Sequence, residues 1–354
     1  MTHNNHPHEP FRVLCFGIGA IGTYIGGSLA HAGCDVVFVE RSEVIKTAQL
    51  SRLKISTPSY EILVNPVKVS ADINNLLKEK KFDVAILAVK AFDTIGIVNS
   101  LEGVKTNIPP ILCLQNGVEN EQVIEEKLGK RSVIGGSITS AVGRNGLGDV
   151  TLEKLRGVGI ETGTPLSERI LEEFNLAGLN AKGYSVRVDM KWSKMLTNLL
   201  VNASAAILNW SPARILINPI TYKIEVLQLR EALAVMKKLG IRVIDLPGTP
   251  VRMLVTLLDV LPLNLGRVLI GTALAKGRGK KMPSLHIDLQ AGRTRSEVEF
   301  LNGAVVRYGE KAGIPTPVNR VLTEILMELA DGKKDKLTYA NNPEMLLKSI
   351  EAAS

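Results

Sequence analysis

The chain is poor in aromatic residues, cysteines and histidines, and each shortage narrows its possible functions. Aromatic residues make up 4% of its 354 residues, too few for the stacking surfaces with which proteins bind single-stranded nucleic acid. Its three cysteines show no metal-ligand spacing, and an odd number in apolar stretches is typical of a reducing compartment. Of the five histidines, three lie in the first ten residues, a stretch without the apolar core of a signal peptide. We therefore expect a cytoplasmic protein without a metal site.

Long apolar runs are also missing, and the charge is not concentrated. No run of about 18 consecutive apolar residues occurs, which predicts that no helix spans a membrane. The net charge of +8 would suit a nucleic acid, but it equally suits an enzyme with anionic ligands. Apart from Lys276–Lys281 the basic residues are scattered, which favours a small anionic partner over a nucleic acid.

A glycine-rich turn near the start of the chain is the strongest functional signal. An apolar segment ending at Phe16 leads into a GxGxxG sequence, and residues 23–32 have helical character. Between a strand and a helix this spacing indicates dinucleotide binding, because it lets backbone N–H groups approach a pyrophosphate. A tight turn without a ligand is the alternative. We expect the whole turn to contact the cofactor: Gly17, Ile18, Gly19, Ala20, Ile21 and Gly22.

The first half of the chain alternates short apolar strands with helices, whereas the second half is helical. This order predicts an α/β fold: a Rossmann-type, doubly wound parallel sheet followed by an all-α domain. We expect a disordered tail over residues 1–10, a dinucleotide-binding domain over 11–185 and a helical substrate and catalytic domain over 186–354. The predicted strands are Phe11–Phe16, Asp35–Val39, Phe82–Val89, Pro110–Leu114, Ser132–Gly135 and Gly157–Glu161. The main predicted helices of the second half are Lys191–Leu208, Ile220–Leu239, Pro250–Leu274, Ser296–Ala312 and Pro317–Asp331.

Polar residues follow three predicted strands, at the edge where a parallel sheet binds its ligand. Glu40 could accept a hydrogen bond from a ribose hydroxyl and favour NAD, whereas Arg41 could bind a 2′-phosphate and favour NADP. Lys90 could reach a phosphate or carboxylate, or simply end its strand in solvent. Asn116 could bind the nicotinamide ribose and a substrate oxygen, or belong to an ordinary Asn-Gly turn with Gly117.

The helical half contains a polar stripe on an otherwise apolar segment. Lys194, Asn198 and Asn202 recur every four residues, which places them on one face of a helix. Buried polar groups need partners, so the stripe indicates a ligand site or an internal hydrogen-bond network. Outside the tail the only histidines are His31 and His286, with His31 far from the glycine turn. Lysine is therefore our candidate for the proton donor.

Two further residues lie near the end of the helical half. Ser284 follows the basic run and could offer its hydroxyl to a substrate carboxylate. Glu297 lies at a predicted helix start, where it could bind a ligand or form a capping box with Thr294.

Together these motifs resemble the ketopantoate reductase (2-dehydropantoate 2-reductase) family over about Arg12 to Leu329. The ordered set comprises GxGxxG, Lys90, Gln115-Asn116-Gly117, Trp192 to Asn202, Glu297 to Gly303 and Gly313 to Asn319. The resemblance implies reduction of a 2-keto acid by NADPH, with 2-dehydropantoate as the expected substrate. It also implies that Lys194 donates the proton and holds substrate together with Asn116, Asn198, Asn202 and Ser284. Lys90, Asn116 and Glu297 would contact the cofactor, and Arg41 would meet the 2′-phosphate.

The chain departs from the family pattern on its substrate side. Pro212 stands where a further substrate asparagine is common, and Asn209 is the nearest amide. The entry to Glu297 is one residue longer than usual, and the run Lys276–Lys281 is additional. These departures leave the identity of the 2-keto acid open, so a related reductase for another 2-keto acid is one alternative. A catalytically silent NADP-binding sensor is another, and NAD is the alternative cofactor. A homodimer is left open.

Overall fold

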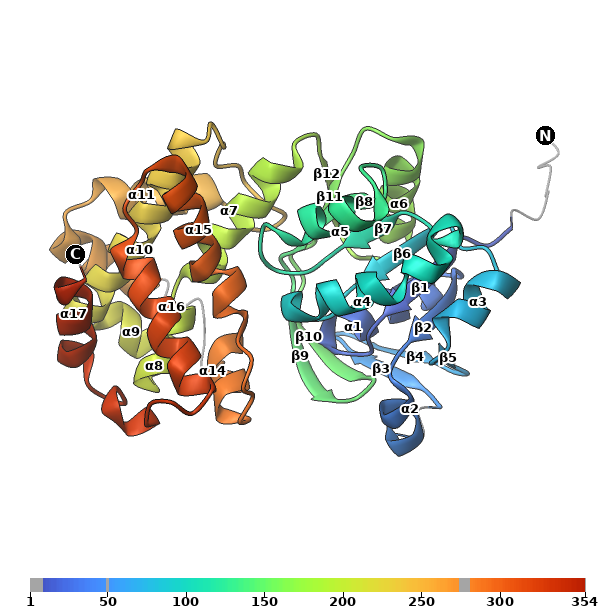
Figure 1. Cartoon of the computed structure of the whole chain (residues 1–354), viewed down its shortest axis with the longest axis horizontal. Coiled ribbons are helices and arrows are strands. Elements are labelled where there is room, and N and C mark those ends of the chain that lie inside the picture. The colour runs from blue at the N-terminus through green and yellow to red at the C-terminus, as the bar shows by residue number, and fades with distance from the viewer. Residues whose placement is uncertain (1–8, 49–50, 274–280, 354) are drawn as a thin grey trace. The chain divides into compact units, whose positions relative to one another are not determined.

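The computed structural model describes residues 9–48, 51–273 and 281–353, which form two compact units (Figure 1). The sheet unit comprises the chain up to Gln115 together with Asn120–Arg187. The helical unit comprises the short segment Asn116–Glu119 and the chain from Val188 onwards. Most of the predicted tail and of the basic run before Lys281 lie outside the described residues.

An eight-stranded, mostly parallel sheet forms the centre of the sheet unit, in the order β12-β11-β8-β7-β6-β1-β2-β5. This confirms the predicted doubly wound fold. Two strands at one edge correct the expectation of an all-parallel sheet. Strand β11 runs antiparallel to β8, with Val158 opposite Ile138, and β12 runs parallel to β11. The strands are β1 Arg12–Phe16, β2 Asp35–Val39, β5 Lys68–Ser70, β6 Val84–Leu87, β7 Ile111–Cys113, β8 Val133–Ile138, β11 Val158–Glu161 and β12 Ala181–Tyr184.

Side chains of the central strands alternate between two cores, one on each face of the sheet. Val13 and Cys15 of β1 pack in the core that includes α1 and α6, whereas Leu14 and Phe16 pack in the core that includes α3, α4 and α5. Burial on both faces explains why these strands are apolar at nearly every position. The helices are α1 Ala20–His31, α2 Ser42–Ala48, α3 Ile73–Glu79, α4 Thr94–Ser100, α5 Asn120–Leu128 and α6 Pro165–Leu176.

A second, four-stranded sheet in the order β4-β3-β10-β9 was not expected from the sequence. It joins distant segments, since Asp149 of β10 lies opposite Lys54 of β3 in a parallel pair. Leu53, Ile55 and Val150 of this sheet share the core that contains α1. Its strands are β3 Leu53–Ser56, β4 Glu61–Val64, β9 Ala141–Gly146 and β10 Asp149–Lys154.

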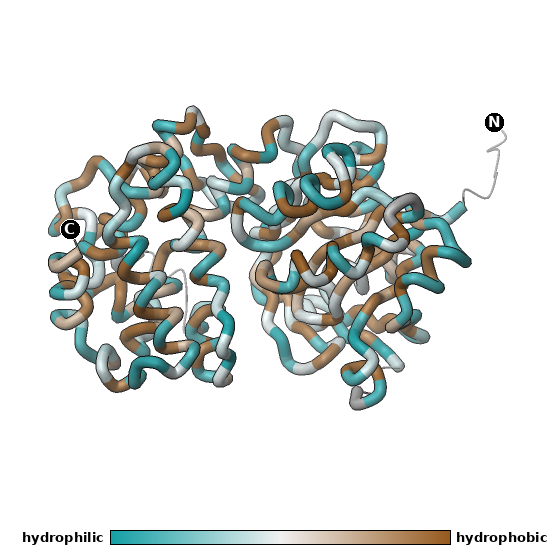
Figure 2. The backbone as a smooth tube through the Cα atoms, viewed as in Figure 1, coloured by the Kyte–Doolittle hydropathy of each residue, from teal (hydrophilic) through white to brown (hydrophobic). Residues whose placement is uncertain are grey.

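The helical unit packs around the long helix α10, and a proline at the first turn starts α9, α10, α16 and α17. In Figure 2, brown apolar and teal polar residues alternate along these helices, as expected when each helix buries one side. The helices are α7 Arg187–Leu199, α8 Asn202–Leu208, α9 Pro212–Ile217, α10 Pro219–Lys238, α11 Val251–Val260, α12 Leu263–Gly266, α14 Ser284–Gln290, α15 Asn302–Ala312, α16 Pro317–Ala330 and α17 Pro343–Ala352.

Three predicted helices of this unit are interrupted. The predicted helix 191–208 breaks at Val201, whose backbone is left-handed with φ 65°. The predicted helix 250–274 ends at Val260 before Pro262, and α12 and a π-helical turn follow it. The predicted helix 296–312 begins as a separate 3-10 helix, Glu297–Phe300. Proline accounts for the second break, whereas contacts described below account for the first.

Candidate functional site

The glycine turn between β1 and α1 has the geometry of a phosphate cradle. Gly17 adopts a φ of +90° and donates its N–H to the Val39 carbonyl, 2.9 Å away. A Cβ on Gly22 would overlap the Gly17 carbonyl oxygen, so only glycine permits this close packing. A Cβ on Gly19 would meet no protein atom within 4 Å, and no side chain caps the start of α1. Open space beside the N–H groups of a helix start suits a bound phosphate.

Glu40 and Arg41 at the end of β2 differ in their hydrogen bonds and in their exposure to solvent. The Glu40 side chain is 15% exposed and accepts the N–H of Ile18 at 3.1 Å and that of Arg41 at 3.0 Å. The Arg41 side chain is 82% exposed, with its Nε 3.8 Å from Glu40. Glu40 thus holds the glycine turn against β2, a role that the sequence pattern did not indicate. Arg41 is the group at this strand end that faces solvent.

Gln115 ties the ends of β6 and β7 together beside Lys90. Its Nε2 donates to the carbonyls of Val89 and Lys90, both at 3.1 Å, and to Thr94 Oγ1 at 2.9 Å. Lys90 is half-buried and precedes a short 3-10 helix that begins at Ala91. The amide of Gln115 therefore fixes the backbone from which the Lys90 side chain starts.

In the helical unit the structure brings Asn116 and Asn198 together. Asn198 Nδ2 on α7 donates a hydrogen bond of 3.0 Å to Asn116 Oδ1. Lys194 lies one turn earlier on the same helix and, like both asparagines, is half-buried. Residues four apart share a helix face, so the predicted stripe holds from Lys194 to Asn198. An ammonium on the same helix face as a paired amide can bind a carboxylate and supply a proton to a developing negative oxygen.

Asn202 does not continue the stripe as predicted. It is the first residue of α8, after the break at Val201, and is therefore not on the same helix as Lys194. Its Oδ1 accepts the N–H of Leu285 at 3.2 Å, which ties α8 to the first turn of α14. Ser284, the first residue of α14, is exposed. The structure thus places Asn202 beside the segment that carries Ser284.

The break at Val201 is held by Glu225 of α10, a residue that the sequence analysis did not single out. Glu225 is 1% exposed and accepts the Val201 N–H at 2.6 Å. It also accepts hydrogen bonds from Ser204 Oγ and from Gln228 Nε2, the latter at 2.7 Å. A glutamate among buried residues of an apolar helix is the signal that could have revealed it, because buried carboxylates need donors.

Glu297 is buried, at 3% exposed, in the 3-10 helix that precedes α15. The capping box expected with Thr294 is wrong, because the Ser296 side chain instead accepts the N–H of Val298 at 3.3 Å.

The departure near Pro212 has its own contact: Asn209 Oδ1 lies 2.7 Å from His286 Nε2 on α14. Burial lowers the pKa of His286.

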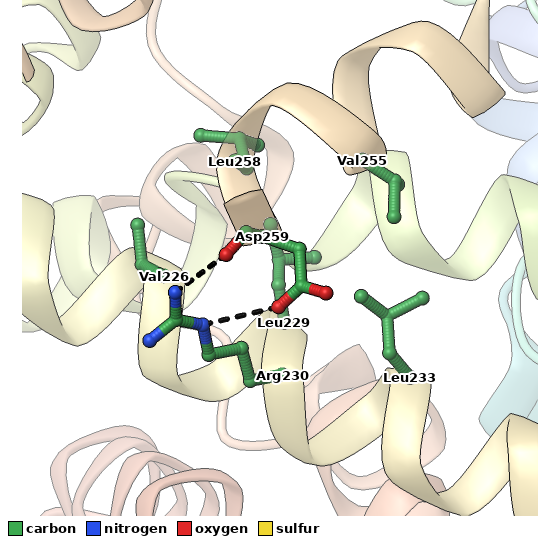
Figure 3. A pocket seen from close by; sticks show the side chains of 7 residues that line it. All are labelled: Val226, Leu229, Arg230, Leu233, Val255, Leu258 and Asp259. Carbon is green, nitrogen blue, oxygen red and sulfur yellow. Dashed lines mark hydrogen bonds and ion pairs between the residues drawn. The ribbon is translucent and has the colours of Figure 1, made fainter. Parts of the chain in front are cut away.

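Three further features of the described residues bear on function: a pocket, metal-ligand clusters and membrane spans. The pocket between α10 and α11 is lined by aliphatic side chains such as Val226, Leu229 and Leu258, beside an Arg230–Asp259 ion pair of 3.2 Å (Figure 3). Its interior does not admit a water molecule, so we assign it no ligand. Across residues 9–48, 51–273 and 281–353, no three His, Cys, Asp or Glu residues gather as metal ligands. The same residues include no helix with the length and apolar character needed to cross a membrane.

Comparison with known proteins gives a consistent match along the chain. The family model described as "Ketopantoate reductase PanE/ApbA" matches residues 13–163, and "Ketopantoate reductase PanE/ApbA C terminal" matches residues 188–330. A 2-dehydropantoate 2-reductase of Pyrococcus horikoshii is 28% identical over 318 residues, covering 88% of this chain and 95% of that protein. One from Archaeoglobus fulgidus is 26% identical over 325 residues, covering 91% and 98%.

Solved structures show the same fold. The crystal structure of a PanE/ApbA family ketopantoate reductase from Ralstonia eutropha matches with a TM-score of 0.74 and 25% identity, covering 91% of this chain and 100% of that one. D-mandelate dehydrogenase, solved with NADH and anilino(oxo)acetate, matches with a TM-score of 0.72. At 20% identity, covering 90% and 98% of the two chains, that match shows the fold alone.

Proposed function

The chain belongs to the ketopantoate reductase family, and on this premise we propose that it reduces 2-dehydropantoate to pantoate with NADPH. It is then a pyridine-nucleotide-dependent oxidoreductase acting on CH–OH groups, as its relatives named 2-dehydropantoate 2-reductase are. The observation that carries the proposal is the pairing of Asn116 with Asn198, one turn from Lys194 on α7. A half-buried lysine on the same helix face as a paired amide is suited to a keto acid, which offers both a carboxylate and a carbonyl.

The cofactor site is supported by the shape of the glycine turn. The open space at Gly19, the uncapped start of α1 and the close packing at Gly22 fit a dinucleotide pyrophosphate. We assign the remaining cofactor contacts to Lys90, Asn116 and Glu297. Both carboxylate oxygens of Glu40 already accept backbone N–H groups, whereas the Arg41 guanidinium is exposed. We therefore propose that Arg41 takes the 2′-phosphate, which selects NADP over NAD.

In the proposed mechanism the chain's own residues bind the substrate and donate one proton to it. NADPH held by the glycine turn, Lys90, Asn116 and Glu297 would supply the hydride for the keto carbon, and the substrate's carbonyl oxygen would then gain a negative charge. The Lys194 ammonium stabilises this oxygen and donates a proton to it. Asn198, Asn202 and Ser284 bind the substrate carboxylate and hydroxyl, and the Asn116–Asn198 hydrogen bond fixes both amides.

The unit to which each of these residues belongs indicates which ligand that unit binds. We propose that the sheet unit binds most of the dinucleotide and that the helical unit supplies the substrate and catalytic side chains. The scattered basic residues support a small anionic substrate rather than a nucleic acid. A cytoplasmic location and a homodimer stay predictions.

Two alternatives make different predictions. A reductase for another 2-keto acid would keep Lys194 and its asparagines but prefer another substrate. The observation that favours it is that Asn209, the amide nearest to the departure at Pro212, contacts His286 on α14. A silent NADP-binding sensor would bind the cofactor without turnover. A screen of NADPH consumption across 2-keto acids, with 2-dehydropantoate included, separates all three.

The Lys194→Ala variant tests the mechanism. Because general acid catalysis by one side chain contributes about 10²–10⁴-fold, we expect kcat/KM to fall at least about a hundredfold. NADPH binding and the melting temperature should be largely retained, and Lys194→Arg should restore little, since its pKa is too high to release a proton. A folded alanine variant within about threefold of the wild type would refute the assignment of Lys194 as proton donor.

A further inference from the structure

One arginine of the helical unit binds two segments that both carry residues of the proposed site. Arg307 lies on α15, and its Nε donates to Glu119 Oε1 at 3.0 Å. Its Nη2 donates to Glu119 Oε2 and also to the carbonyl oxygen of Glu299, which is 2.9 Å away. The guanidinium thus makes a two-pronged contact with a carboxylate and a third hydrogen bond to backbone, a geometry that fixes both partners in orientation.

Both partners of Arg307 are close in sequence to proposed cofactor contacts. Glu119 ends the segment Asn116–Glu119, which belongs to the helical unit although it directly follows the sheet unit's Gln115. The other end of this segment is Asn116, held by Asn198. Glu299 lies two residues after Glu297 in the same 3-10 helix. We propose that Arg307 is a positioning residue that fixes Asn116 and Glu297 to receive the nicotinamide half of the cofactor, an inference that rests on the proposed function.

The surroundings of Arg307 support such a role. Its side chain is 38% exposed and that of Glu119 is 21% exposed, so the ion pair is partly shielded from water. The hydrogen bond with Glu119 raises the pKa of Arg307. A Cβ on Gly303, one turn earlier on α15, would lie 3.3 Å from Arg307 Nη1. The glycine therefore leaves room for the guanidinium beside the first turn of α15.

The contacts also predict how strongly each substitution should disturb the positioning of Asn116 and Glu297. Lysine presents a single ammonium and has no planar fork, so Arg307→Lys cannot hold the Glu119 carboxylate and the Glu299 carbonyl together. Glu119→Gln keeps one acceptor oxygen but loses the charge. We therefore expect Arg307→Gln to be the most affected variant, with Arg307→Lys and Glu119→Gln intermediate.

The test compares two ligands that share the adenine half of the cofactor. Adenosine 2′,5′-bisphosphate carries the 2′-phosphate but no nicotinamide ribose, whereas NADPH carries both. Binding of each is measured by calorimetry for the wild type and the variants. We expect Arg307→Gln to raise the Kd of NADPH about tenfold, as loss of one or two hydrogen bonds would. The Kd of the bisphosphate should stay within about twofold, because its contacts lie in the sheet unit.

Kinetics and a matched control complete the experiment. Because a misplacement of about 1 Å can cost 10²-fold in rate, kcat/KM for the keto acid should fall roughly ten- to a hundredfold in Arg307→Gln. The control is Arg320→Gln, which removes another ion pair of α15 and α16, with Arg320 Nη2 2.8 Å from Glu310. We expect Arg320→Gln to match the wild type in both binding and kinetics.

The outcomes separate this inference from the function on which it rests. Arg307→Gln could weaken the binding of both ligands equally, or lower the melting temperature and leave NADPH binding unchanged. Either result would show that Arg307 only stabilises the fold and would overturn the inference. If Arg307→Gln fails to fold, Glu119→Gln provides the same comparison. A wild-type protein that binds NADPH yet reduces no 2-keto acid overturns the proposed function, while the two-ligand comparison still tests the positioning role.

Discussion

Replacing Glu225 by glutamine should both destabilise the helical unit and impair the proposed site. Glu225 accepts the Val201 N–H at 2.6 Å, the Gln228 Nε2 at 2.7 Å and the Ser204 hydroxyl, from a position 1% exposed. Glutamine has nearly the same shape, but one acceptor oxygen becomes an NH₂ group that donates. Oε2 of Glu225 accepts both N–H groups, whereas Oε1 accepts the Ser204 hydroxyl, which can also act as an acceptor. A glutamine that turns its NH₂ group toward Ser204 therefore keeps all three contacts but loses the charge that strengthens them.

The expected loss of stability follows from these contacts. A hydrogen bond to a charged group contributes about 1.5–3 kcal/mol, compared with about 0.5–1.5 kcal/mol for a neutral one, so each contact loses about 1 kcal/mol. Removing a buried negative charge offsets part of this, because a buried carboxylate is itself costly to desolvate. We therefore expect Glu225→Gln to lower the free energy of unfolding by about 1–3 kcal/mol.

The same substitution should alter the geometry between Asn198 and Asn202. Val201 adopts a φ of 65°, which costs a β-branched residue about 1–2 kcal/mol relative to a helical backbone. The Glu225 carboxylate compensates by accepting the Val201 N–H. Once that contact is weakened, the break between α7 and α8 is less well held, and the Asn202 amide loses its fixed position. We expect kcat/KM to fall about tenfold or more in the folded variant.

The assay combines urea unfolding with steady-state kinetics on the same preparations. Glu351→Gln on α17 is a suitable control, because Glu351 is exposed and its ion pair with Lys223 is long, at 3.9 Å. We expect the control to change the free energy of unfolding by less than about 0.5 kcal/mol. A Glu225→Gln variant as stable and as active as the wild type would refute the reasoning that Glu225 holds the break.

Other predictions concern single side chains. Arg41→Ala should weaken NADPH binding roughly ten- to a hundredfold and leave NADH nearly unchanged; a wild type that prefers NADH would contradict this. Asn198→Ala should impair KM or kcat with a smaller drop in melting temperature than Asn202→Ala, because Asn202 is the acceptor of the buried Leu285 N–H whereas the Asn198–Asn116 bond is only half-buried. Burial lowers the pKa of His286 from 6.5, so unfolding takes up a proton in acid and stability falls as pH drops below about 6.5. His286→Gln should flatten the profile of melting temperature against pH between about 7.5 and 5; an unchanged slope would exclude this residue as its source.

Local sequence patterns predicted most of the sheet unit because its signals are short-range. The glycine turn, the apolar runs of the parallel strands and the long helices are each encoded by residues close together in the chain. The second sheet is different. Its strands are short and carry exposed polar residues such as Glu61, and its parallel pair joins Lys54 to Asp149. The periodicity of apolar residues within one segment does not predict a pairing with a segment so far away in the chain.

The break at Val201 shows the same limit at the site itself. The recurrence of Lys194, Asn198 and Asn202 predicts one continuous helix, and the structure keeps that helix only as far as Leu199. The break depends on a carboxylate at Glu225, 24 residues further along the chain, which a helical pattern does not contain. Periodicity therefore accounts for Lys194 and Asn198, whereas tertiary contacts place Asn202 against α14. A backbone that departs from its local preference and is held there by a buried charge is typical of a functional site. The proposed substrate contacts thus lie where local and long-range interactions disagree.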